Sequence, residues 1–329
     1  MLTAKLRLLA TYFIIGGKDM LFVELLLLAL GFVLLVKGAD WFVEGTSGIA
    51  DKFGIPQLVI GLTIVAMGTS APEAAVSITA ALKGNADITV GNVVGSNILN
   101  IFIILGIASV ITSIAIAKTT IRYEIPIMLA STLLLLVCGA TGGTINLLEG
   151  IIMWVCFLGY LAYMFVLMKK GEMQAEEIET KDTPIWKMIL MGVIGLVLII
   201  WGSDITVNAA TSLAKMFGMS ERFIGLTIVA LGTSLPELFT SVVAARRGKA
   251  DIAIGNIVGS NIFNILFVVG TSAVIIPVDF VSSFVIDCIV AILAGIVLWV
   301  CTFRKRKLTR TGGIIMLICY LAYFLYLLF

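Results

Sequence analysis

The chain has 329 residues, of which 60% are hydrophobic and 13% charged, with a formal net charge of +2 and a mean hydropathy of +1.14. This composition argues against a water-soluble protein and is typical of an integral membrane protein. The chain contains no histidine, which excludes Ser-His-Asp and Cys-His catalysis, and its small net charge gives no support for nucleic-acid binding. We therefore expect a membrane protein that is not an enzyme and has no cofactor.

Apolar stretches long enough to cross a bilayer as helices occur about ten times along the chain, which predicts an all-α fold. They lie near 21–49, 56–82, 88–116, 123–141, 148–168, 185–215, 221–245, 252–276, 281–302 and 311–328.

Two segments are predicted to lie outside these spans. Residues 1–19 have too short an apolar run to cross a bilayer, and we expect an N-terminal extension that either precedes a true start at Met20 or is a cleaved signal-like segment. The stretch KKGEMQAEEIETKDTP at 169–184 is rich in Glu and Lys and ends in proline. It predicts a solvated linker between two five-span halves, 20–168 and 185–329.

The basic residues predict the orientation of the chain in the cell membrane. If the first span begins outside, most Lys and Arg fall in connections on one side, among them Lys52, Arg122 and the cluster RKRKLTR at 304–310. The connections 141–148 and 277–280 contain none. The positive-inside rule therefore favours an outward N-terminus and a cytoplasmic linker.

The two halves contain an internal repeat at an offset of 164 residues. Residues 61–106 align without a gap on residues 225–270, and about 28 of the 46 aligned positions are identical. Because each half has an odd number of spans, the second copy must enter the membrane from the opposite side. This is the inverted-topology architecture of secondary transporters, and it suggests alternating access.

Each repeat carries a proline inside a span, in GTSAPE at 68–73 and GTSLPE at 232–237. Pro72 and Pro236 lack an amide hydrogen and clash with the carbonyl four residues back, so we expect each helix to break and to free the carbonyls of Gly68 and Gly232. Unwound backbone is tolerated at membrane depth only where it is buried in protein or lines a cavity. The broken turns therefore predict carbonyl ligands.

Glu73 and Glu237 follow these prolines, and no Lys or Arg lies in the middle of either span to neutralise them. Two carboxylates at membrane depth require cations or protons. In the next span of each repeat a polar residue recurs every four positions, which places three on one helical face. These residues are Asn92, Ser96 and Asn100 in the first repeat and Asn256, Ser260 and Asn264 in the second. All of these ligands are hard oxygens, which suit calcium and sodium.

Other polar residues in the spans have a structural interpretation beside the functional one. Asn92, Asn97, Asn256 and Asn261 are expected to bond neighbouring helices. Asp87 and Asp251 precede apolar runs and are expected to cap helices. For Asp40 and Asp204 two interpretations remain open, a water-filled entry path or a bond to a neighbouring helix.

At these motifs the chain resembles the calcium/cation antiporter superfamily, whose repeats carry GTS-x-PE followed by GN-x-x-GSN, and within it prokaryotic sodium/calcium exchangers. The resemblance implies that Glu73 and Glu237 bind calcium together with the carbonyls of Thr69 and Thr233. It also implies sodium sites, with Asn100 near the centre. These are Ala66, Ser70 and Ser96 in the first repeat and Ala230, Ser234 and Ser260 in the second.

The chain departs from some members of this superfamily at Asn264, where they have an aspartate. Both central positions, Asn100 and Asn264, are amides here. The predicted site then holds two negative charges, which balance one calcium or two sodium ions.

The sequence thus predicts an antiporter that exchanges calcium for sodium within the bilayer, with no obligate protein partner. A proton/calcium antiporter is the nearest alternative, because a carboxylate in apolar surroundings can bind protons. A cation channel shares the oxygen chemistry, although broken inverted repeats suit alternating access better. An intramembrane aspartyl protease would require Asp40 and Asp204 to form a pair.

Overall fold

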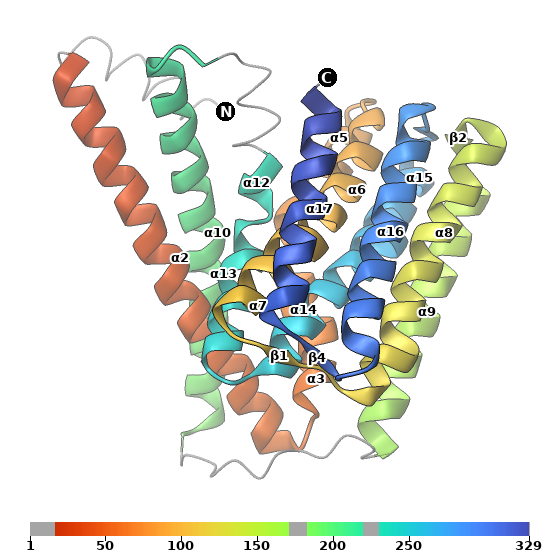
Figure 1. Cartoon of the computed structure of the whole chain (residues 1–329), viewed down its shortest axis with the longest axis horizontal. Coiled ribbons are helices and arrows are strands. Elements are labelled where there is room, and N and C mark those ends of the chain that lie inside the picture. The colour runs from red at the N-terminus through yellow and green to blue at the C-terminus, as the bar shows by residue number, and fades with distance from the viewer. Residues whose placement is uncertain (1–16, 171–182, 220–229, 329) are drawn as a thin grey trace.

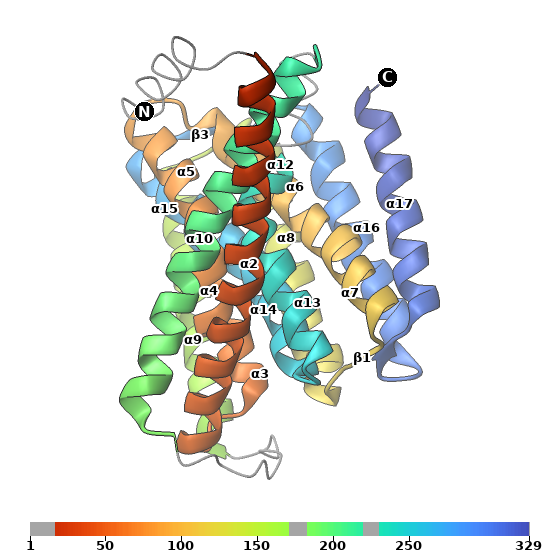
Figure 2. The same cartoon turned by 90° about the vertical axis from the view of Figure 1, so that its left-hand side faces the viewer.

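Long helices form a bundle, and most of them run along one common direction (Figures 1 and 2). The computed structural model describes residues 17–170, 183–219 and 230–328. Eight helices of this part are long and apolar enough to cross a membrane, and a helix pair bent by 50°, Gln57–Thr69 with Ala71–Leu82, forms a ninth candidate. The all-α membrane fold is therefore confirmed.

The first half contains five candidate spans, some of them built from shorter α-helical and π-helical (η) pieces. They are α2 (Gly17–Phe53); α3 (Gln57–Ile60) with η1 (Gly61–Val65), α4 (Ala66–Thr69) and α5 (Ala71–Leu82); α6 (Asp87–Leu99) with η2 (Asn100–Leu105) and α7 (Gly106–Ile111); η3 (Thr120–Glu124) with α8 (Ile125–Gly142); and α9 (Leu147–Lys170).

The second half follows the same order where the structure describes it. Its helices are α10 (Ile185–Met216); α12 (Ala230–Thr233) with α13 (Leu235–Arg246); α14 (Ala250–Phe263) with η5 (Asn264–Val269) and α15 (Gly270–Ile275); α16 (Ser283–Phe303); and α17 (Arg310–Leu328). The span predicted at 221–245 and the linker at 169–184 fall partly outside the described residues. The count of ten spans therefore stays a prediction.

The 164-residue repeat of the sequence is also a repeat of structure. The π-helix η2 at Asn100–Leu105 recurs as η5 at Asn264–Val269, and α5 at Ala71–Leu82 recurs as α13 at Leu235–Arg246. Each shift equals the sequence offset, so the π-helical irregularity that begins at Asn100 is duplicated at Asn264.

Helix α2 and its equivalent in the second half, α10, run in opposite directions. Helices α2 and α10 form the largest helix-helix contact among the described residues and pass close to each other at glycines on both helices. The neighbours are Gly31 with Gly202, Gly38 with Gly195, and Gly45 with Gly192. Residue numbers rise along α2 as they fall along α10, so the two helices are antiparallel, as an inverted repeat requires.

Two small sheets join the halves to each other. Strand β1 (Ile114–Ala115) pairs with β4 (Lys307–Leu308), and β2 (Thr144–Ile145) pairs with β3 (Val278–Asp279), both antiparallel. The β1–β4 pair lies at one end of the bundle and β2 at the other (Figure 1). Each sheet therefore takes one strand from each half.

The centre of the bundle is formed by equivalent spans of the two repeats. In an apolar stretch of 18 residues, the span Ala250–Ile275 is 94% buried and its counterpart Ile88–Ile111 is 72% buried, whereas the six other long helices are at most 39% buried. Outer helices such as α2 expose large apolar side chains, as a lipid-facing surface requires. Polar groups of the two central spans are thus kept away from lipid.

Two sequence expectations about helix ends are wrong. Helix α6 begins at Asp87 with Ala86 as its N-cap residue, and α14 has Lys249 as its N-cap residue, so neither Asp87 nor Asp251 occupies a cap position. A carboxylate inside the first turn still interacts favourably with the positive end of the helix dipole, which explains why acidic residues occur there.

The close contact of α2 and α10 generates a prediction. A Cβ atom at Gly45 would lie 2.5 Å from both the Gly192 nitrogen and the Met188 carbonyl oxygen, which belong to backbone and cannot turn aside. We expect Gly45→Ala to lower the free energy of unfolding by about 1–3 kcal/mol through overpacking. Thermal unfolding of the purified protein in detergent measures this loss. The control is Gly159→Ala in α9, where no atom lies within 4 Å, and equal stability of the two variants would contradict the prediction.

Candidate ion-binding site

Both spans that carry the GTS-x-PE motif are broken at the serine of the motif. In the first repeat α4 ends at Thr69, Ser70 has φ −80° and ψ 6°, and α5 starts at Ala71. In the second repeat Ser234 has φ −90° and ψ 4° between α12 and α13. The prolines fall in the first turn of the following helix, where their missing N–H would be unbonded anyway. The predicted breaks are confirmed.

The carbonyl that the second break was expected to free does have a donor. The Ser203 hydroxyl of α10 donates to the Gly232 oxygen over 2.7 Å. This oxygen is therefore part of helix packing, and its donor could not be predicted from the sequence because Ser203 lies in a different span.

Glu73 and Glu237 lie in the first turns of α5 and α13, and both side chains are fully buried. A helix N-terminus carries partial positive charge from its unbonded N–H groups, which favours a carboxylate there. This field lowers the free-energy cost of burial without neutralising the charge. Neither carboxylate makes an ion pair with Lys or Arg in the part of the chain that the structure describes.

Each glutamate accepts a hydrogen bond from the serine of the opposite break. Ser70 donates to Glu237 Oε1 over 2.8 Å, and Ser234 donates to Glu73 Oε1 over 3.4 Å. Ser96 also donates to Glu73 Oε1 over 3.4 Å and lies 3.1 Å from the Ser234 hydroxyl. The two repeats thus bring their breaks and their carboxylates to one place.

The asparagines predicted to bond neighbouring helices do so. Asn92 donates to the Ser77 hydroxyl over 2.9 Å, and its counterpart Asn256 donates to Ser241 over the same distance. Asn97 and Asn261 each donate to the other's backbone carbonyl over 3.1 Å. These reciprocal bonds tie the two central spans together.

The predicted polar face of the first central span is divided. Asn92 and Ser96 face α5, whereas Asn100 starts η2 and donates to Asn261 Oδ1 of α14 over 2.9 Å. Its counterpart Asn264 donates to Asn97 Oδ1 over 3.2 Å. The amide nitrogens of Asn100 and Asn264 are both used as donors, whereas their Oδ1 atoms accept no hydrogen bond.

Four oxygens of this region are buried acceptors without a donor. They are Oε2 of Glu73 and of Glu237 and Oδ1 of Asn100 and of Asn264, two pairs related by the repeat. Buried polar atoms are nearly always hydrogen-bonded, so unsatisfied acceptors gathered in one region call for an explanation. Hard, partly anionic oxygens without donors suit alkali and alkaline-earth cations.

Some of the remaining predicted ligands form hydrogen bonds near these oxygens, and others do not. The Thr69 hydroxyl lies 2.9 Å from Asn256 Oδ1, and Ser260 donates to the Ala66 carbonyl over 3.3 Å. Ala230 starts α12. Thr233 is half-buried, and within the described chain its side chain makes no hydrogen bond to the network. Ten of the twelve predicted residues are therefore connected by hydrogen bonds or unsatisfied oxygens.

Asp40 lies apart from the buried glutamates. Arg247, which follows α13, binds Asp40 over 2.9 Å and Glu44 over 3.2 Å. The antiparallel register of α2 and α10 sets Asp40 and Asp204 at different levels, because Gly38 lies beside Gly195 and not beside residue 204. Asp40 thus bonds a neighbouring helix, and the two aspartates do not form the pair that a protease requires. Sequence reasoning missed Arg247 because it lies at a helix end.

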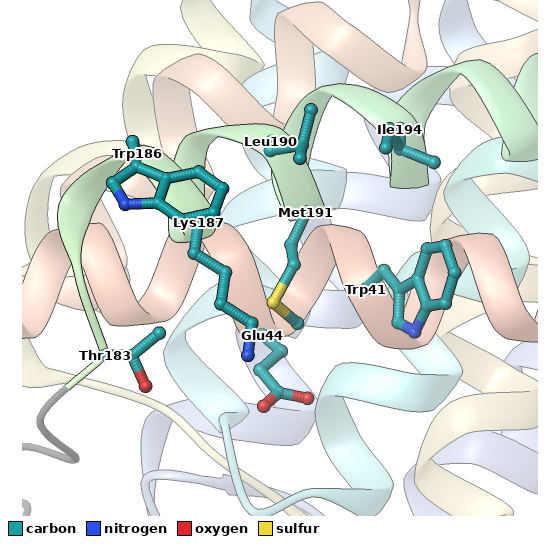
Figure 3. Close-up of a pocket in the computed structure, with 8 residues that line it drawn as sticks. All are labelled: Trp41, Glu44, Thr183, Trp186, Lys187, Leu190, Met191 and Ile194. Atoms are coloured by element: carbon teal, nitrogen blue, oxygen red, sulfur yellow. The ribbon is translucent and has the colours of Figure 1, made fainter.

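A surface groove of about 440 Å³ lies between α2 and α10 (Figure 3). Trp41 and Glu44 of α2 line it on one side, and Trp186, Lys187 and Met191 of α10 line it on the other. None of the predicted ligands contributes to it. The groove is therefore no part of the candidate ion site.

Comparison with known proteins agrees with this arrangement. The family model described as sodium/calcium exchanger protein matches residues 23–166 and 187–329. The chain is 41% identical to the putative antiporter CaxA of Alkalimonas amylolytica, over 91% of this chain and 96% of that protein. It is 32% identical to the sodium/calcium exchanger MaX1 of Methanosarcina acetivorans, over 94% of this chain and 100% of that protein.

A solved structure extends the agreement to the fold. The sodium-calcium exchanger NCX_Mj, soaked with zero Na⁺ and Ca²⁺, superposes with a TM-score of 0.81 at 29% identity, covering 93% of this chain and 99% of that one. Duplicated broken helices, a buried oxygen cluster and a match over most of both halves lead to one conclusion: the chain belongs to the sodium/calcium exchanger family of membrane cation antiporters.

Proposed function

We propose that this protein exchanges calcium for sodium across the membrane by alternating access. The observation that carries the proposal is the set of four buried acceptor oxygens without donors on Glu73, Glu237, Asn100 and Asn264. A buried carboxylate without a counter-charge costs several kcal/mol, so the cluster favours occupation by cations. Calcium and sodium both prefer such oxygens, and they are the ions named for MaX1.

In this proposal calcium lies between Glu73 and Glu237, with backbone carbonyls of Thr69 and Thr233 completing its coordination. Sodium ions occupy the flanking oxygens of both repeats. These belong to Ala66, Ser70, Ser96 and Asn100 in the first repeat and to Ala230, Ser234, Ser260 and Asn264 in the second. Because the two ions share carboxylates, binding of one excludes the other, and this competition couples their transport.

An asymmetry between the repeats supports alternating access. Arg247 ties α13 to α2 through Asp40 and Glu44. The residues at the equivalent positions are Lys83, Asp204 and Asn208, and among described residues neither Lys83 nor Asp204 makes an ion pair. We infer that the contact at Arg247 holds one access route closed while the equivalent route is open, and that transport exchanges the two arrangements.

The orientation follows the basic residues. Lys52, Arg122 and Arg247 belong to the end of the bundle where α2 finishes and β1 pairs with β4. In our proposal this end is cytoplasmic, so the N-terminus lies outside and the segment 169–184 links the halves 20–168 and 185–329 on the inner side.

Calcium uptake into proteoliposomes tests the proposed function directly. Uptake is measured under imposed gradients of sodium, potassium and protons in turn. We expect only the sodium gradient to drive calcium uphill. Uptake driven by protons alone would identify a proton/calcium antiporter, and single-channel currents would identify a channel.

The role of the two glutamates generates a second prediction. Glu73→Gln or Glu237→Gln removes one of two charges that balance calcium, so we expect calcium transport to fall below detection while the protein remains folded and extractable. Glu149→Gln is the control, because that carboxylate accepts from the Asn146 amide at a helix start and lies outside the site. Calcium flux near the parent's rate in either mutant would show that the glutamates are structural.

The charge of the site generates a third prediction. With amides at Asn100 and Asn264, the two carboxylates balance one calcium or two sodium ions, and a third sodium would leave net positive charge in an apolar bundle. We therefore expect sodium-driven calcium uptake to be insensitive to an imposed membrane potential. Asn264→Asp adds a carboxylate, so this variant should take up an additional sodium ion and become sensitive to the potential. A potential-dependent parent would contradict the two-charge site.

The ion pairs of Arg247 generate a fourth prediction. These side chains are about one-third to one-half exposed, and exposed pairs contribute about 0.2–1 kcal/mol each. Arg247 makes two such pairs, so Arg247→Gln should change the ratio of apparent sodium affinities on the two sides of the membrane by at most about thirty-fold. Uptake assays with oriented vesicles measure this ratio, and Lys83→Gln serves as the matched control. An equal effect of both variants would contradict the asymmetry.

A further inference from the structure

A third buried glutamate lies outside the proposed transport site. Glu124 is the last residue of η3, directly before α8, and its side chain is fully buried. This burial could not be predicted from the sequence, because Glu124 follows the charged stretch KTTIRY and lies at the predicted beginning of a span. The helix begins earlier than expected, which brings the carboxylate into the protein.

The two carboxylate oxygens of Glu124 have different surroundings. The Tyr163 hydroxyl of α9 donates to Oε1 over 2.7 Å. Oε2 is buried and has no hydrogen-bond partner in the described structure, and the same holds for the hydroxyl of Thr120. Thr120 lies four residues before Glu124, so both side chains share one face of this helical stretch. The Thr120 hydroxyl lies near the carboxylate and interacts with it without forming a regular hydrogen bond, so Oε2 has a neutral neighbour and no counter-charge.

No cation of the described chain neutralises Glu124. Its own segment contributes Arg122, whose guanidinium lies over the Tyr123 ring at 5.7 Å and makes no described ion pair with the carboxylate. On α9 it faces the phenols of Tyr160 and Tyr163, and Asp251 of α14 adds negative charge nearby. From α16, the Trp299 indole donates to the Ile121 carbonyl over 2.9 Å and brings no charge.

A buried carboxylate in these surroundings costs several kcal/mol unless a positive charge accompanies it. We propose that Glu124 forms a second cation site, distinct from the transport site, which holds one monovalent cation, a proton or sodium, on its free Oε2 atom. One carboxylate balances one unit charge, whereas a divalent ion would leave excess positive charge among apolar side chains. This inference goes beyond the proposed exchange function and does not depend on it.

Helix α9 connects Glu124 to the broken helix through hydrogen bonds of two tyrosines. Tyr160, one turn from Tyr163, donates to the Leu62 carbonyl of η1 over 3.0 Å. The neighbouring Gly61 packs against the backbone of Asp251 and Ile252 in α14. The helix α9 therefore binds both Glu124 and the half of the broken span that leads to Ala66–Thr69. Occupation of the site by a cation keeps this junction together, because it removes the repulsion between Glu124 and Asp251.

The test uses the full chain carrying Glu73→Gln and Glu237→Gln, so that the transport carboxylates give no signal and no transport is required. Infrared difference spectroscopy of the purified protein distinguishes protonated from ionised carboxyl groups while sodium is added or pH is changed. The comparison adds Glu124→Gln to this background. Glu149→Gln, which removes a carboxylate with a backbone donor, is the matched control.

We expect the background protein to have a carboxyl signal that Glu124→Gln abolishes and Glu149→Gln leaves unchanged. A protonated-acid band that sodium does not alter identifies the proton as the ligand. Loss of that band, or a shift of the carboxylate bands, on addition of sodium identifies sodium. If Glu124→Gln does not fold, Tyr163→Phe keeps the carboxyl group and must shift the same signal. A signal unchanged by every substitution at Glu124 and Tyr163, or an ionised carboxylate insensitive to sodium, overturns the proposal.

Discussion

The cost of holding Glu73 and Glu237 inside an apolar bundle is the constraint on which the rest of the structure depends. Neither carboxylate has a basic partner among the described residues, so the surrounding elements are arranged to lower this cost. Each lies at a helix N-terminus created by a break, and each accepts from a serine of the other repeat. The breaks, the serines and the closeness of the two repeats can thus be understood as one solution to an electrostatic problem.

The internal repeat provides a helix break, a serine and a glutamate in each half. It also suits a conformational exchange between the halves. In the proposed mechanism, two equivalent halves that run in opposite directions and share one central site exchange their conformations without changing their overall fold. The reciprocal bonds of Asn97 and Asn261 fix the centre, while glycines such as Gly38 and Gly195 allow α2 and α10 to approach closely with little side-chain interlocking. A hydrogen-bonded centre and a glycine-lined contact between α2 and α10 are consistent with movement of the outer helices around a fixed site.

The helix breaks and the pairing of the two repeats could be predicted from the sequence, because the prolines and the repeated motifs can be read directly from it. Pro72 and Pro236 determine where the helices break, and the 164-residue offset pairs residues that prove to be spatial counterparts. The pattern could not reveal contacts that depend on how helices pack. The hydrogen bond from Ser203 to Gly232 and the ion pairs of Arg247 join residues from different spans. The burial of Glu124 likewise depends on neighbouring helices. Asp251 was misjudged because a helix start shifted by two residues changes a cap into a first-turn position.

The two small sheets constrain how the molecule can be assembled during synthesis. Strands β1 and β2 of the first half find their partners only in β4 and β3 of the second, so their backbone groups have no sheet partner until the later part of the chain has been made. Because such long-range pairing follows membrane insertion of nearly all the helices, the first half has to wait in an incomplete state. Closure of the two sheets, one at each end of the bundle, is therefore a late event that requires both copies of the repeat.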